Sequence, residues 1–88
     1  MITVTPIDDT TFEVVVETNA TTRHKVTVKP SYREKLTGNR VAAEVLVEKS
    51  FEFLLERESN ASILRSFDLP VIGRYFPEYE SVIRKMLE

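Results

Sequence analysis

The chain of 88 residues contains no cysteine and a single histidine, His24. Without cysteine, disulfides, zinc–thiolate sites and thiol nucleophiles are excluded. The two glycines, Gly38 and Gly73, are too few for a glycine-rich loop that cradles phosphate groups. No apolar run approaches the roughly 20 residues that a membrane-spanning helix needs. The first residues also lack the basic and apolar regions of a secretion signal. We therefore expect a soluble, cytoplasmic protein.

Composition and length indicate one globular domain over residues 1–88. Hydrophobic residues make up 42% of the chain and charged residues 30%, which is too apolar for a disordered protein. A chain of this size buries roughly 60–65% of the surface of its unfolded form, enough for one modest core.

The first third of the chain has the alternation of β-strands. Residues 2–5 alternate as a short first strand that ends at Pro6, and residues 12–16 and 24–28 alternate as a hairpin. One face of the hairpin carries Phe12, Val14, Val16, His24, Val26 and Val28. Glu13 and Glu17 face the basic residues of the second strand on the other side, which favours antiparallel pairing.

The remainder has the periodicity of helices. Pro30 suits the first turn of a short helix and Gly38 a left-handed stop, after which Asn39 can cap a long helix over 41–58. We expect a short turn over 63–67, a short helix over 69–75 capped by Asp68, and a final helix after Pro77. The apolar face of the long helix is formed by Ala43, Leu46, Val47, Phe51, Phe53 and Leu54, and that of the final helix by Tyr79, Val82, Ile83, Met86 and Leu87. The predicted fold class is α+β: a small antiparallel sheet, made of the hairpin plus the short first strand, covered on one face by one long and two or three short helices.

Four glutamates, one every four residues, follow one side of the long helix: Glu44, Glu48, Glu52 and Glu56. They form a solvated face or a contact for a basic partner. A hard metal ion needs converging oxygens, whereas this row spreads its carboxylates over about 18 Å. We therefore predict no metal site and no cofactor.

Basic residues are concentrated between positions 23 and 40, where six stand against one acid, Glu34. These six are Arg23, Lys25, Lys29, Arg33, Lys35 and Arg40. They could contact an acidic partner or the phosphates of a nucleic acid, or pair with acids of the same chain. The isoelectric point near 5.5 and the lack of an aromatic pair at RNA-binding spacing count against nucleic acid.

His24 lies in phase with Val26 and Val28, so it should point inward and be hydrogen-bonded, with Thr22 as one candidate partner. Catalysis needs an orienting or nucleophilic partner, and no spacing provides one, so we do not expect an enzyme. The aromatic residues Phe67, Tyr75, Phe76 and Tyr79 form either the second part of the core or a groove for an extended peptide.

The segments TTRHKVTV (21–28), EKSFEFLLERE (48–58) and SILRSFDLPVIGRYFPEYE (62–80) resemble short, uncharacterised bacterial proteins with no assigned activity. The resemblance covers most of the chain from about Phe12 onward, implies a small bacterial cytoplasmic domain and transfers no catalytic residue. From the residues themselves we expect a non-catalytic protein-interaction module. Its two helices and Val15 present more apolar faces than a small core covers, which favours a homodimer. Nucleic-acid binding through residues 23–40 is the alternative.

Overall fold

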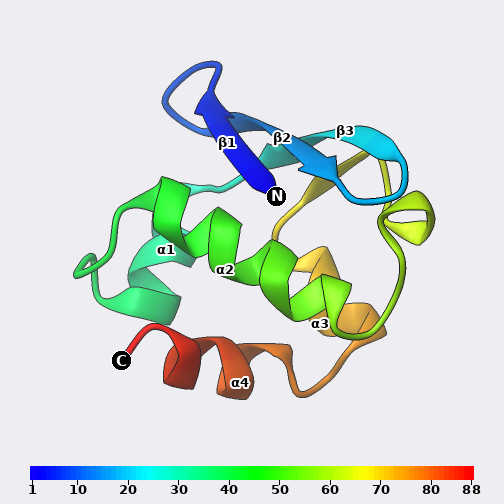
Figure 1. The fold of residues 1–88 in the computed structure, drawn as a ribbon. Coiled ribbons are helices and arrows are strands. Elements are labelled where there is room, and N and C mark those ends of the chain that lie inside the picture. Colours follow the sequence, from blue (N-terminus) through cyan, green and yellow to red (C-terminus); the bar gives the residue numbers. More distant parts are fainter.

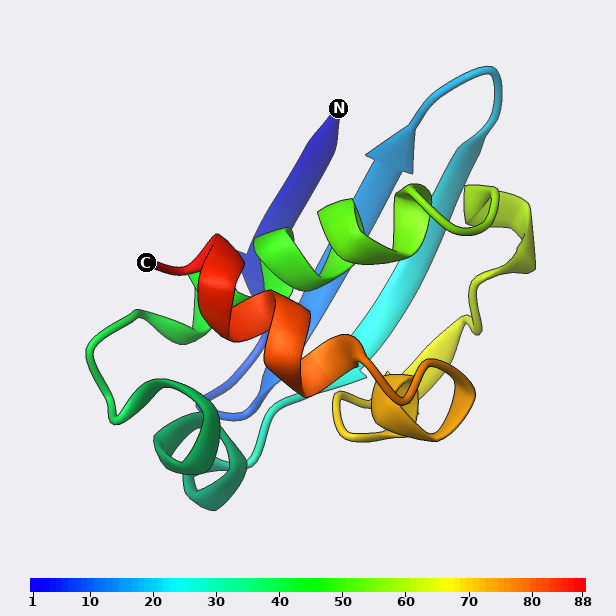
Figure 2. The same ribbon diagram turned by 90° about the horizontal axis from the view of Figure 1, so that it is seen from below.

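The computed structural model describes residues 1–88 as a four-stranded sheet with its helices packed on one face (Figures 1 and 2). The elements are β1 (Ile2–Pro6), β2 (Thr11–Glu17), β3 (Thr21–Thr27), α1 (Pro30–Thr37), α2 (Ala43–Leu55), a 3₁₀ turn (Asn60–Ser62), β4 (Ser66–Asp68), α3 (Val71–Tyr75) and α4 (Tyr79–Met86). The predicted α+β class, with strands first and helices after, is confirmed.

The sheet has the order β1-β2-β3-β4. The first three strands pair antiparallel, as predicted, but β4 pairs parallel with β3 and makes the sheet mixed. The expected helical turn over 63–67 is therefore wrong. The segment is instead extended from Ser66, and the core takes only Phe67 of this strand as a half-buried side chain. One inward residue is too few to give a visible alternation.

The hairpin register explains why β2 and β3 alternate. Val14 pairs with His24 and Glu13 with Lys25, so the apolar set faces the helices while charges face outward. Every member of the predicted inner face is buried. On the outer face the guanidinium of Arg23 lies 3.6 Å from a carboxylate oxygen of Glu13, as the opposite signs of the two strands indicated.

Helix α2 lies between the sheet and α4 (Figure 1). Its predicted apolar face is buried, except that Ala43 is half-buried. Burial of each large side chain contributes roughly 1.5–3 kcal/mol. The same helix also buries Ser50, whose hydroxyl donates to the carbonyl of Leu46 at 2.7 Å. Since this hydroxyl has one proton, the fully buried Tyr79 hydroxyl, 2.6 Å away, donates to Ser50.

The ends of the helices follow the sequence signals only in part. Gly38, with φ of 63°, ends α1 in the left-handed conformation as predicted. Asn39 does not cap the long helix. Its own backbone is in the left-handed conformation, with φ of 61°. Asn39 therefore continues the turn after α1, and α2 starts only at Ala43. The predicted cap at Asp68 is also wrong, because this residue is the last of β4.

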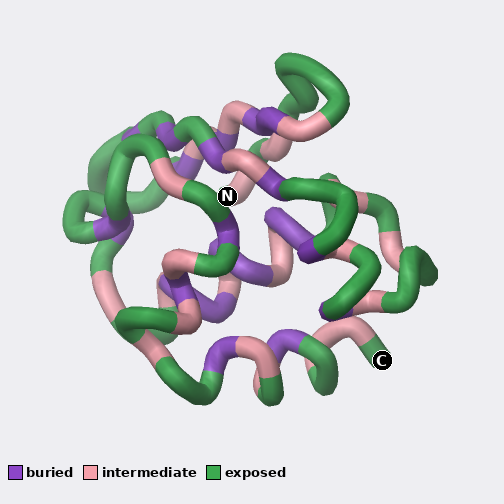
Figure 3. The backbone as a smooth tube through the Cα atoms, turned by 180° about the vertical axis from the view of Figure 1, so that it is seen from behind, coloured by how far each residue is buried: buried purple, intermediate pink, exposed green.

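Most buried residues lie along β2 and β3 and on the inner sides of the helices, whereas the turns over 7–9, 18–21 and 38–40 are exposed (Figure 3). Tyr79 and Ile83 of α4 are fully buried, and Val82, Met86 and Leu87 pack half-buried against them. The apolar faces of both the long and the final helix are thus covered within one chain. The two helices therefore leave less apolar surface for a partner than the sequence suggested, and Val15 on the outer face of the sheet is half-buried.

Candidate functional sites

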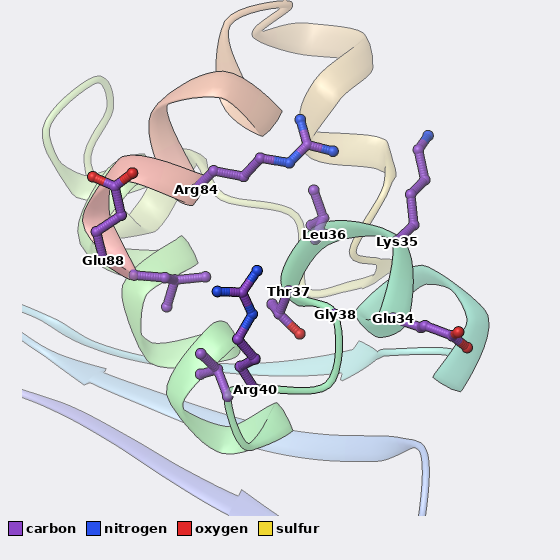
Figure 4. Close-up of a pocket in the computed structure, with 10 residues that line it drawn as sticks. Glu34, Lys35, Leu36, Thr37, Gly38, Arg40, Arg84 and Glu88 are labelled. Atoms are coloured by element: carbon purple, nitrogen blue, oxygen red, sulfur yellow. The ribbon is translucent and has the colours of Figure 1, made fainter.

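Two concave sites lie on the helical side of the sheet, and they differ in chemistry. The larger is a cleft of about 460 Å³ formed by the second half of α1, the turn over 38–41 and the residues 84–88 at the end of α4 (Figure 4). Three cations line it, Lys35, Arg40 and Arg84, together with the acids Glu34 and Glu88. We call it the α1–α4 cleft.

The cations of the α1–α4 cleft are unequally neutralised. The ammonium of Lys35 lies 3.7 Å from a carboxylate oxygen of Glu80. That carboxylate also accepts a hydrogen bond of 2.9 Å from the hydroxyl of Tyr32, and burial together with this bond raises the pKa of Tyr32. Neither Arg40 nor Arg84 has a carboxylate oxygen within 4 Å. Two guanidinium groups of this cleft therefore lack an internal partner.

The smaller site is an apolar groove of about 150 Å³ beside β4. It lies between the end of α2, the loop over 62–64, β4 and α3, and eight of its ten lining residues are hydrophobic. Two of them stand out at its rim, because Leu64 is 46% and Tyr75 67% exposed. We call it the β4 groove.

The predicted aromatic group is divided between core and groove. Tyr79 belongs to the core, where its ring lies 5.2 Å from that of Phe53. Phe67, Phe76 and Tyr75 line the β4 groove instead. Sequence reasoning missed Leu64 and Val71 as groove residues, because only the parallel pairing of β4 brings the loop before it next to α3.

The β4 groove runs beside an open sheet edge. The N–H of Lys25 donates to the carbonyl of Arg65 at 2.8 Å, and that of Leu69 to the carbonyl of Thr27 at 3.0 Å. Backbone groups alternate in direction along a strand, so those of Ser66 and Asp68 point away from β3. They form the free edge of the sheet next to the groove.

The structure does not bring the six basic candidates onto one surface. Arg23 and Lys25 alternate with the inward His24, so they lie on the outer face of the sheet. The other four lie on the opposite, helical side: Lys29 precedes α1, Arg33 and Lys35 belong to it, and Arg40 follows it. Arg33 donates from Nε to the carbonyl of Val41 at 2.8 Å and serves the turn after α1. Only Lys35 and Arg40 meet in one site, the α1–α4 cleft.

The four acidic candidates lie on the side of α2 away from the core. Glu44 and Glu56 are exposed, and Glu48 and Glu52 are half-buried. The ammonium of Lys49 lies 3.4 Å from Glu52, and the guanidinium of Arg57 lies 3.5 Å from Glu56. Local cations thus neutralise half of the row. No group of three or more histidine, aspartate or glutamate side chains is arranged to hold a metal ion.

His24 points inward and is hydrogen-bonded, as predicted, and is only 2% exposed. Its Nδ1–H donates to the carbonyl of Leu64 at 2.8 Å, which fixes the tautomer, so Nε2 accepts from the hydroxyl of Thr22 at 2.9 Å. Thr22 in turn accepts from the amide of Asn60 at 3.0 Å. Burial lowers the pKa of His24. This buried network ties the loop after α2 to the hairpin, and His24 lines neither the cleft nor the groove.

Comparisons with family models, with curated proteins and with solved structures found no match to this chain. The resemblance to short bacterial proteins therefore stays a prediction. None of the helices has the length and the apolar character that crossing a bilayer requires.

Proposed function

We propose that this protein is a non-catalytic interaction module that binds an extended segment of a partner protein in the β4 groove. The observation that supports this role is the apolar lining of the groove with Leu64 and Tyr75 exposed at its rim. Exposed apolar surface around a concave site is typical of protein-interaction sites. The expectation of a bacterial, cytoplasmic protein is part of this proposal.

The free edge of β4 favours an extended partner over a helical one. Outward N–H and C=O groups at Ser66 and Asp68 can pair with the backbone of an added strand. Side chains alternate along such a strand, so every second one would point to the side on which Phe67 lines the groove. A single large apolar side chain of the partner fits a groove of about 150 Å³.

One acid, Glu58, lines the groove, and the two cations next to it favour a partner segment that carries acids beside its apolar residue. Arg65 and Arg74 are exposed, directly adjoin lining residues in the chain, and have no carboxylate within 4 Å. Such charges at the rim mainly raise the association rate and the specificity. The proposed partner is thus an extended segment with an apolar anchor and flanking carboxylates.

Two other readings have less support. Outside the groove, the exposed large apolar residues are Met1, Ile7 and Val45. They belong to the N-terminus, the β1–β2 turn and α2, so they offer a homodimer little continuous apolar surface. Nucleic-acid binding loses its continuous basic surface, because Arg23 and Lys35 lie on opposite sides of the sheet and both face carboxylates. A catalytic role finds little support at His24, whose two ring nitrogens are both engaged.

The test is selection of random peptides displayed on phage against the purified protein, followed by affinity measurement with synthetic versions. Enriched sequences should contain one large apolar residue flanked by aspartate or glutamate. The double variant Leu64→Glu/Tyr75→Ser should lose at least about tenfold in affinity, because it adds repulsion and removes both rim contacts. Both side chains are exposed, so the fold should tolerate the change.

Val45→Ser is the matched control, since it removes an exposed apolar residue outside the groove and should leave peptide affinity unchanged. Light scattering on a size-exclusion column reveals whether a second copy occupies the groove instead. Selection that enriches no peptide, or peptides that bind the double variant as tightly as the parent, would refute the proposal.

A further inference from the structure

The α1–α4 cleft combines unpaired positive charge with an apolar floor. Its floor is formed by Leu36, which is buried, and by Val41 and Leu87, which are half-buried. Its volume of about 460 Å³ is within the range of roughly 300–1,000 Å³ that small-molecule sites occupy. It is chemically distinct from the β4 groove.

Two neutral donors of the cleft are already used within the chain. The N–H of Gly38 already donates to the carbonyl of Glu34 at 2.8 Å. The hydroxyl of Thr37 donates to the carbonyl of Arg33, also at 2.8 Å. The guanidinium groups of Arg40 and Arg84 face no carboxylate within 4 Å and present planar, bidentate donors.

The two arginines line the cleft from different elements. Figure 4 shows Arg40 extending from the turn into the space between α1 and α4, and Arg84 extending from α4 towards α1. In the same view Glu34 points away on the outer side of α1. The C-terminal ends of two helices adjoin the cleft, but each carries only about half a negative charge. Glu88 also lines the cleft, but no carboxylate oxygen lies within 4 Å of either guanidinium group, so both remain available to an anion.

We infer that the α1–α4 cleft binds a small molecule that carries an oxyanion, a phosphate or a carboxylate, on an apolar group. Arg40 and Arg84 hold the oxyanion with bidentate, charge-assisted hydrogen bonds. Leu36, Val41 and Leu87 contact the apolar group. The low dielectric of this floor strengthens the charge interaction relative to water.

The experiment is a titration followed by amide chemical shifts in ¹H–¹⁵N NMR spectra at pH 7 and low salt. Phenyl phosphate is the main probe, with benzoate and inorganic phosphate as comparisons. We expect saturable shifts confined to residues 37–41 and 84–88 and weaker affinity at high salt. Phenyl phosphate should bind at least about fivefold tighter than inorganic phosphate, because only the former covers the floor. The benzoate titration distinguishes a carboxylate from a phosphate ligand.

Variants separate this site from general surface attraction. Arg40→Gln and Arg84→Gln, both exposed, should each weaken phenyl phosphate binding at least about tenfold. Arg23→Gln is the matched control, since it removes an exposed arginine on the outer face of the sheet, away from the cleft, and it should leave phenyl phosphate binding unchanged. Melting curves of all three variants verify the fold.

The inference is overturned if no probe produces saturable shifts up to 20 mM, a concentration roughly twentyfold above a millimolar dissociation constant. It is equally overturned if the Arg40→Gln/Arg84→Gln protein binds as tightly as the parent. Equal affinities for phenyl phosphate and inorganic phosphate would remove the apolar group from the assignment.

Discussion

The hydrogen bond between Ser50 of α2 and Tyr79 of α4 allows a quantitative test of how the two helices are held together. Both side chains are fully buried, and a single chain of hydrogen bonds runs from the Tyr79 hydroxyl through Ser50 to the carbonyl of Leu46. Burial raises the pKa of Tyr79, so the hydroxyl stays protonated and remains a donor. The Tyr79 hydroxyl therefore needs Ser50 as its acceptor, whereas the Ser50 hydroxyl keeps its bond to Leu46 without Tyr79.

Removing the acceptor should cost more than removing the donor. Ser50→Ala leaves the Tyr79 hydroxyl buried without an acceptor, which should lower the free energy of unfolding by about 1–3 kcal/mol. The better helix propensity of alanine offsets about 0.5 kcal/mol of this loss. Tyr79→Phe leaves Ser50 bonded to Leu46 and should cost only about 1 kcal/mol.

The double variant Ser50→Ala/Tyr79→Phe should be at least as stable as Ser50→Ala alone, because it buries no unpaired hydroxyl. Urea unfolding of the four proteins, followed by circular dichroism, measures the free energies and shows whether the m-value stays constant. Each 1 kcal/mol corresponds to about 4–8 °C in melting temperature for a domain of this size. If the two single losses simply add in the double variant, the hydrogen-bond assignment is wrong.

Three further outcomes follow from the structure. Because burial lowers the folded-state pKa of His24 below its unfolded value, the unfolded chain binds more protons at acid pH. Urea unfolding should therefore show stability rising from pH 5.5 to about 7.5 and level above, a rise that His24→Gln should lack. Gly38→Ala should destabilise the protein by about 1 kcal/mol, because φ at this position is +63°. Gly73→Ala places no atom within 4 Å of the new Cβ and should stabilise the protein by about 0.5–1 kcal/mol. Thermal melts measure both changes. Fluorescence anisotropy at 50 mM salt should detect no binding of a DNA oligonucleotide. Salt-sensitive binding that the variant Arg33→Glu/Lys35→Glu loses would instead support nucleic-acid binding.

Strong local patterns were predictable from the sequence. Residues 12–16 and 24–28 alternate because one face of the sheet is buried and the other is wet, so pattern and register agree. The face of α2 was equally clear, since Phe51 and Leu54 are buried. The inward direction of His24 followed from the same phase.

Features that depend on tertiary contacts were not predictable. β4 has three residues and a single inward side chain, so its pairing with a strand some 40 residues earlier leaves no periodic signal. Asparagine commonly caps helices, but Asn39 has a left-handed backbone and lies in the turn between α1 and α2. The α1–α4 cleft joins segments that are distant in the chain. The β4 groove lies within residues 54–76, but its shape depends on the pairing of β4. Both sites escaped sequence reasoning for these reasons.

The parallel pairing of β4 has a consequence for how the molecule folds. Its hydrogen bonds close a loop that contains α1 and α2, so the chain must lose the entropy of this closure before the strand gains any contact. The hairpin and α2 need no such closure. We expect amide hydrogens of Phe67 to exchange faster than those of Val26, although the two residues are partners in the sheet. The β4 edge would then be the last part of the sheet to assemble and the first to open.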